Sequence, residues 1–362
     1  MILFSLGLPG RLAEWCDAVL AHLVSRFEDG VALITWPPLA NMFGYHEVAA
    51  VLDQVALSLI AQDATHIIIG ARQPDERLRA ALVATKARFV LALDDPRFAV
   101  ADILAGTNGD LKGVTRAIAN SCPFVMRFAS LPGAITIRGY QAGLDALGAV
   151  MAVARHFEFS LNDGEAQSIV DELATRGLHY APQAVCEDPI TTHRVVVGAL
   201  AAYAEWFAGG DLAQIVWPRQ LFAVNGGSGH GPIEALDLQG GARILIFGPY
   251  IHLPAGSWMA RVVLGFSPEA AGHTFYVDAY SGGQRALAER SFQPMKAGVY
   301  TLDIDFSLDE PSGLGLEIRV FVSSDNARGQ LAFGQVILRP LAMRQPDVVA
   351  GPQDDFRTVL DL

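Results

Sequence analysis

The chain has 362 residues, of which 51% are hydrophobic and 18% are charged, and its net charge is −12. This apolar content excludes wholesale disorder, and the acidic balance argues against nucleic-acid binding, which needs the opposite sign of charge. The N-terminal segment lacks the basic start of a signal peptide, and no apolar run is long enough to span a bilayer. Three cysteines lie far apart, without a CxxC motif, so we expect a cytoplasmic protein without a metal site.

Residues 1–182 alternate short apolar runs with amphipathic stretches, which is typical of a parallel sheet with crossover helices. The apolar runs are continuous, as expected for strands that are covered on both faces. We therefore predict a three-layer α/β domain. Its strands are expected over residues 2–6, 31–36, 66–69, 88–93 and 134–138. Its clearest helices are expected over residues 12–27, 46–61, 76–85, 142–157 and 163–176, and two more follow residue 96.

The second half of the chain has a different pattern. Residues 183–215 predict a helical linker, with its helix over residues 193–207. From residue 216 to 342 glycine-rich turns separate runs that alternate apolar and polar residues, which predicts an all-β sandwich of the jelly-roll kind. Residues 343–362 are expected to form a C-terminal tail.

The loop after the first predicted strand is the first candidate site. In doubly wound sheets ligands bind beyond the carboxyl ends of the strands, and backbone amides at a helix N-terminus bind anions. The loop supplies Gly7, Pro9, Gly10 and Arg11 at that place, so it is a candidate phosphate site. It lacks the lysine and hydroxyl of a working P-loop, and the alternative is an ordinary tight turn.

Three segments in order resemble the sulfotransferase family. Residues 4–15 resemble its loop for the 5′-phosphosulfate of the donor PAPS, residues 87–102 its 3′-phosphate strand, and residues 135–165 the run near the end of its domain. The resemblance covers about residues 1–180 and implies a P-loop-like parallel sheet. It also implies that residues 7–11 and Arg97 would contact the nucleotide PAPS or its product PAP.

The departures from the family pattern predict that this activity is lost. Asp94 stands where the family has an arginine, and Asp102 stands where it has a serine. Two carboxylates at a 3′-phosphate site repel the ligand that they should hold. We therefore expect no PAPS or PAP cofactor and no active PAPS-dependent sulfotransferase.

No catalytic residue can be assigned from the sequence. By placement after predicted strands, His46 and Asp75 are candidates for a general base. The alternative for each is a helix cap or a surface position, and Asp75 suits a cap. The glycine-rich run over residues 226–231 precedes β structure and not a helix, so we interpret it as a loop.

The predicted sandwich holds a second candidate site. Strand alternation places Tyr276, Asp278 and Tyr280 opposite the core, and the same logic exposes Asp303 and Asp305. It also exposes the next strand's polar set, Glu317, Arg319 and Phe321. Aromatic rings stack on the apolar face of a sugar, and carboxylates accept its hydroxyl protons. The run over residues 248–258 resembles the first strand of carbohydrate-binding modules, so we expect a carbohydrate or polysaccharide ligand.

Three hypotheses follow for the whole chain. The first is a glycan-associated protein, with a degenerate donor site and a sugar-binding sandwich, that binds or scaffolds in surface polysaccharide biosynthesis. The second is an active sulfotransferase or other group transferase that modifies a polysaccharide. The third is an interaction module whose polar sandwich face packs on the first domain or on a second copy as a homodimer.

Overall fold

The computed structural model divides the chain into two compact units. The first comprises residues 1–102, 124–186 and 346–362, and the second comprises residues 103–123 and 187–345. Residues 103–123, which the sequence pattern assigns to the first domain, therefore belong to the second unit, together with residues 187–215 of the predicted helical linker. The structure describes residues 2–26, 31–35, 66–139, 145–180, 189–225, 235–282, 286–309 and 315–343. The predicted helix over residues 46–61 and nearly all of the predicted tail lie outside these residues.

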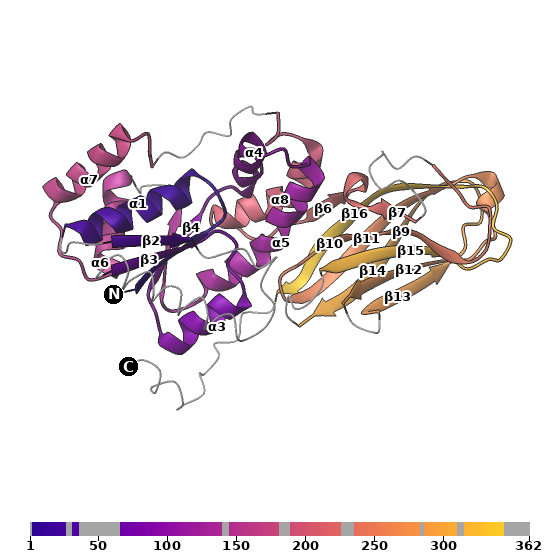
Figure 1. Cartoon of the computed structure of the whole chain (residues 1–362). Coiled ribbons are helices and arrows are strands. Elements are labelled where there is room, and N and C mark those ends of the chain that lie inside the picture. The colour runs from indigo at the N-terminus through magenta and orange to yellow at the C-terminus, as the bar shows by residue number, and fades with distance from the viewer. Residues whose placement is uncertain are drawn as a thin grey trace. The chain divides into compact units, whose positions relative to one another are not determined.

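A five-stranded parallel sheet forms the centre of the first unit, as predicted. Its strands run in the order β2-β3-β1-β4-β5, and Figure 1 labels β2, β3 and β4. The connection after β1 leads to β2 at one edge of the sheet, whereas the connection after β4 leads to β5 at the other edge. Because β1 and β4 are neighbours, the switch point of the sheet lies between them. The strands are β1 (Ile2–Gly7), β2 (Val31–Thr35), β3 (His66–Ala71), β4 (Phe89–Leu93) and β5 (Ala134–Arg138).

Helices α1, α6 and α7 pack together with the sheet in one hydrophobic core (Figure 1). A capping box fixes the start of α7, because Asn162 and Glu165 each accept a hydrogen bond from the other's backbone amide. Helix α5 crosses the boundary between the units, which falls at its internal Pro123. The helices are α1 (Arg11–Ser25), α3 (Glu76–Thr85), α4 (Pro96–Gly106), α5 (Leu111–Ala129), α6 (Ala146–His156) and α7 (Asp163–Thr175).

The second unit contains helix α8 (Arg194–Phe207) and two antiparallel sheets. The β12 sheet has the order β13-β12-β15-β9-β7, with β10 paired to β15, and the β11 sheet has the order β14-β11-β16-β6, with β8 paired to β16. The strands of the β12 sheet are β7 (Ala223–Val224), β9 (Arg243–Phe247), β10 (Pro249–Ile251), β12 (Phe275–Ser281), β13 (Ala288–Phe292) and β15 (Leu316–Val322). Those of the β11 sheet are β6 (Ile215–Pro218), β8 (Leu236–Asp237), β11 (Gly256–Phe266), β14 (Gly298–Leu308) and β16 (Gln330–Met343).

The two sheets share one core, as the alternating pattern predicts. Every second residue of β11 is buried over its full length. Its Phe266 contacts Phe275 of the β12 sheet at 4.7 Å between ring centroids. Helix α8 approaches β6 closely, because a Cβ at Gly198 would lie 2.8 Å from the carbonyl oxygen of Val216. Among the described residues no helix has the length and apolarity needed to cross a bilayer.

Candidate ligand sites

The loop between β1 and α1 lies at the switch point of the parallel sheet, where a ligand was predicted. Gly7 is buried, and a Cβ there would lie 2.8 Å from the carbonyl oxygen of Ala92 on β4. Gly10 has φ +147°, and no side chain caps α1. Pro9 is half-buried and Arg11 is exposed. The glycines are therefore explained by close strand contact and backbone conformation, while the first amides of α1 face the switch point.

Asp102 brings a carboxylate to this loop. An oxygen of Asp102 lies 3.4 Å from the position that a Cβ at Gly10 would take. Burial, together with the negative charges of Asp95 and Asp102, raises the pKa of Asp94 to about 6. These negative charges would repel an anion at the loop.

Two arginines of the first unit, Arg72 and Arg97, are already paired with carboxylates. Arg97 donates from Nε to both oxygens of Asp95 at 2.9 Å, and this hydrogen bonding raises the pKa of Arg97. Arg72 donates to Asp17 and to the carbonyl oxygen of Ala13. The charge of Arg97, which the sulfotransferase resemblance implies as a nucleotide contact, is thus matched by a neighbouring carboxylate.

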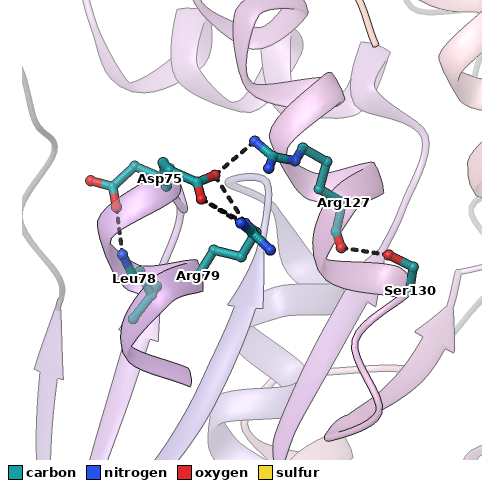
Figure 2. Close-up of polar contacts among 6 residues, drawn as sticks. Asp75, Leu78, Arg79, Arg127 and Ser130 are labelled. Atoms are coloured by element: carbon teal, nitrogen blue, oxygen red, sulfur yellow. Dashed lines mark hydrogen bonds and ion pairs between the residues drawn. The ribbon is translucent and has the colours of Figure 1, made fainter. Parts of the chain in front are cut away.

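Asp75 is the N-cap of helix α3. Its Oδ1 accepts a hydrogen bond of 2.8 Å from the backbone amide of Leu78, as Figure 2 shows. Burial raises the pKa of its carboxyl group. The neighbouring Glu76 forms ion pairs with Arg79 at 2.6 Å and with Arg127 at 2.7 Å. The capping interpretation of Asp75 is therefore confirmed, whereas His46 lies outside the described residues.

One face of the β12 sheet gathers the aromatic and charged side chains of two neighbouring strands. Cross-strand pairing sets Tyr276 opposite Phe321, Asp278 opposite Arg319, and Tyr280 opposite Glu317. These residues alternate with the buried core positions of β12 and β15, so they share the face that points away from the core. We name this set of six residues the β12–β15 face.

Arg319 is held at the centre of this face. Its Nε donates to Asp278 Oδ1 at 2.8 Å, and its Nη2 donates to Asp278 Oδ2. The guanidinium carbon lies 4.0 Å from the ring centroid of Tyr280 and 5.3 Å from that of Phe321. Asp278 is only 4% exposed, so the two charges neutralise each other in a largely desolvated setting.

Tyr250 extends the face beside a shallow hollow. The ring is 40% exposed, and its phenol hydrogen-bonds Glu317, whose pKa is raised by burial. Phe247 packs edge-on against Tyr250, at 6.3 Å between ring centroids. The hollow measures about 220 Å³ and is lined by Asn225, Ile244, Phe247, Tyr250, Glu317 and Arg319. We call this set of residues the β15 hollow.

The structure divides the five residues that the sequence predicted for carbohydrate. Tyr276, Asp278 and Tyr280 lie together on the β12–β15 face, but Asp303 and Asp305 belong to β14 in the other sheet. Asp303 accepts hydrogen bonds of 2.8 and 2.7 Å from Arg261, which lowers its pKa. Alternation along a strand identifies the outward side, but it does not say which sheet holds the strand.

Three residues that line the β15 hollow were not predicted from the sequence: Tyr250, Phe247 and Asn225. Tyr250 lies inside the run over residues 248–258 that carries the resemblance to carbohydrate-binding modules, so a signal was present there. Phe247 and Asn225 have no such local signal, because the pairing of β7 with β9 brings their segments together. Among the described residues, no three histidine, cysteine, aspartate or glutamate side chains form a group that could hold a metal ion.

Comparisons with known proteins give only distant similarities. No protein family and no curated protein matches the sequence. A mouse sulfotransferase complexed with PAP matches 56% of this chain and 77% of its own, at 11% identity and a TM-score of 0.35. A carbohydrate-binding module, TmCBM61, in complex with β-1,4-galactotriose matches 35% of this chain and 88% of its own, at 12% identity and a TM-score of 0.23.

A second carbohydrate-binding module comes from a xylanase of the Trinervitermes trinervoides hindgut metagenome. It matches 36% of this chain and 99% of its own, at 13% identity and a TM-score of 0.24. The chain spans only 19% and 23% of two matched glycoside-acting proteins, an α-L-arabinofuranosidase and an Arthrobacter globiformis isomaltodextranase. These similarities assign no activity to this chain.

Proposed function

We propose that this protein binds a glycan through the β15 hollow. The observation that carries the proposal is the partly exposed ring of Tyr250 beside a hollow walled by Glu317 and Arg319. An aromatic ring of this kind stacks on the apolar CH face of a sugar. Glu317 accepts hydroxyl protons when ionised, and the guanidinium of Arg319 donates in a fixed orientation because Asp278 holds it.

The size and charge of the hollow favour a single, neutral sugar ring. Its volume of about 220 Å³ is below the range of roughly 300–1,000 Å³ that is typical of sites for drug-sized ligands. Asp278 and Glu317 carry two carboxylates, and the positive charges of Arg319 and Arg116 both act on the phenol of Tyr250. The local charges are therefore balanced, which favours a neutral sugar over a sulfated sugar or a uronic acid.

In this proposal the first unit keeps a sulfotransferase-like sheet without a working donor site. Asp102 lies beside the loop that would hold phosphate, its negative charge and that of Asp95 act on Asp94, and Arg97 is already paired. A chain with a sugar-binding unit and a disabled donor site suits a binding or scaffolding component in polysaccharide biosynthesis better than a transferase.

The test is calorimetric titration of the full chain with neutral oligosaccharides. The probes are β-1,4-linked galactose, xylose and glucose oligomers of three to six units, together with their uronic acid counterparts. We expect one neutral series to bind, and we expect Tyr250→Ala and Glu317→Gln to weaken binding at least tenfold. Asp303→Asn is the matched control, because its carboxylate pairs with an arginine in the other sheet, and it should bind like the wild type. The proposal fails if no oligosaccharide binds, or if the Tyr250 variant binds unchanged.

A further inference from the structure

The backbone conformation of Tyr250 needs support from its surroundings. Tyr250 has φ +64°, in the left-handed region that residues with a Cβ rarely adopt. Such conformations persist where neighbouring structure imposes them, and they cluster at ligand sites. The ring of Tyr250 lines the β15 hollow from the short strand β10, so contacts that hold this backbone also help to place the ring.

Gly315 provides one side of this support. A Cβ at Gly315 would lie 2.4 Å from both the carbonyl carbon and the carbonyl oxygen of Tyr250, and 2.8 Å from the amide nitrogen of Ile251. Only a glycine allows the two backbones to approach so closely. This contact fixes how near Tyr250 lies to β15, with which its strand β10 is also paired.

Asn120 provides the other side. Its Nδ2 donates to the carbonyl oxygen of Tyr250 at 3.0 Å, and its Oδ1 accepts from the backbone amide of His252 at 2.7 Å. The side-chain amide of Asn120 therefore bridges the backbone on both sides of Ile251, and it satisfies the carbonyl group of Tyr250 and the amide group of His252. The two contacts bridge 130 and 132 positions of sequence.

The helix that carries Asn120 is anchored to the same unit by a second contact. Arg116 lies one turn earlier on α5 and donates to the carbonyl oxygen of Leu221, and burial lowers its pKa. Residues four apart lie on the same face of a helix. Two side chains of that face thus hold the backbone of the second unit, and residues 103–123 are part of this unit.

We propose that Asn120 is a positioning residue for sugar binding, acting through Tyr250. This inference rests on the proposed function of the β15 hollow. It adds that the site is completed by helix α5, from the first third of the sequence, and not by the β-rich region alone. Asn120 touches no ligand in this scheme, since both of its amide groups are occupied by backbone.

The experiment is a double-mutant cycle in the full chain, with the neutral oligosaccharide that binds the wild type. Asn120→Ala should weaken binding about tenfold, and Asn120→Asp should weaken it too, because a carboxylate oxygen replaces the donor to Tyr250. In the Tyr250→Ala background, Asn120→Ala should have no further effect, which NMR titration at millimolar oligosaccharide can measure. Ser121→Ala is the matched control: its hydroxyl bonds only within α5, to the carbonyl oxygen of Ala117.

Each outcome decides between the two proposals. If the wild type binds no neutral oligosaccharide, the proposed function and the role of Asn120 fail together. If the wild type binds and both Asn120 variants bind equally well, the β15 hollow stands and the positioning role is wrong. Additive losses in the cycle also overturn the positioning role, because they would mean that Asn120 acts independently of Tyr250. Asn120→Asp preserves the side-chain shape, so it covers the case in which Asn120→Ala fails to fold.

Discussion

Two arginine–aspartate pairs in the second unit have the same hydrogen-bond geometry but different exposure, and they should respond differently to the loss of the carboxylate. In the pair of Arg319 and Asp278 the side chains are 20% and 6% exposed. In the pair of Arg261 and Asp303 they are 34% and 40% exposed. Removing one partner of a buried pair leaves a desolvated charge without compensation, whereas an exposed charge is hydrated again.

The expected magnitude for Asp278→Ala follows from this exposure. Breaking a fully buried pair costs about 3–5 kcal/mol. Arg319 keeps some contact with water and stays over the ring of Tyr280, so we expect a loss of about 2 kcal/mol. Asp303→Ala should change the free energy of unfolding by less than the error of the measurement.

Urea denaturation of both variants, followed by near-ultraviolet circular dichroism, measures the two losses. Asp278→Ala should lower the midpoint of the transition of the second unit with little change in its slope, and Asp303→Ala should leave the midpoint in place. Equal losses, or a larger loss for Asp303→Ala, would refute the argument that burial controls the strength of these pairs. Asp278→Asn provides a check on cavity effects, because it keeps the side-chain volume.

The remaining predictions concern both units. The folded pKa of Asp94, about 6, lies above its ordinary value of 3.8, so the folded state binds more protons between pH 4 and 6 and stability falls as pH rises through this window. Asp94→Asn should flatten that slope and stabilise the protein at pH 7 by up to about 3 kcal/mol, as urea denaturation at each pH will show. Gly315→Ala should lower the melting temperature and weaken sugar binding together, since its Cβ would collide with the backbone of Tyr250; an unchanged melting temperature would contradict the close approach. Calorimetry at low salt should give no heat with PAP, and a dissociation constant below about 100 µM would show that a nucleotide site survives.

Much of the fold could be predicted from the sequence, because local pattern and burial agree there. The run over residues 89–93 is apolar throughout, and it forms β4, which is buried at every position. The helix predicted over residues 163–176 forms α7, which begins directly after its N-cap Asn162. Strand β16 was not singled out, although it has 14 residues, because Gly334 and Pro340 interrupt its pattern and its pairing with β11 shifts register.

The candidate site was only half predictable. Alternation along β12 placed Asp278 and Tyr280 on the outward face, since period two is a local property of a strand. The position of Tyr250 depends on Gly315 and Asn120, which are 65 and 130 positions away along the chain. Single-sequence patterns carry no information about such pairs. For the same reason the sequence grouped Asp303 with residues of the other sheet.

The division of helix α5 at Pro123 has a consequence for synthesis of the chain. Residues 103–123 leave the ribosome well before the strands with which they fold, and Asn120 precedes Tyr250 by 130 positions. At roughly 5–20 residues per second, this delay is on the order of ten seconds. Ile118 and Cys122 are fully buried in the folded protein. During this delay the rest of the second unit, with which they fold, has not yet been synthesised. The nascent chain therefore cannot complete its domains strictly one after the other, and a chain released after residue 186 would present an unfinished apolar helix face to chaperones and proteases.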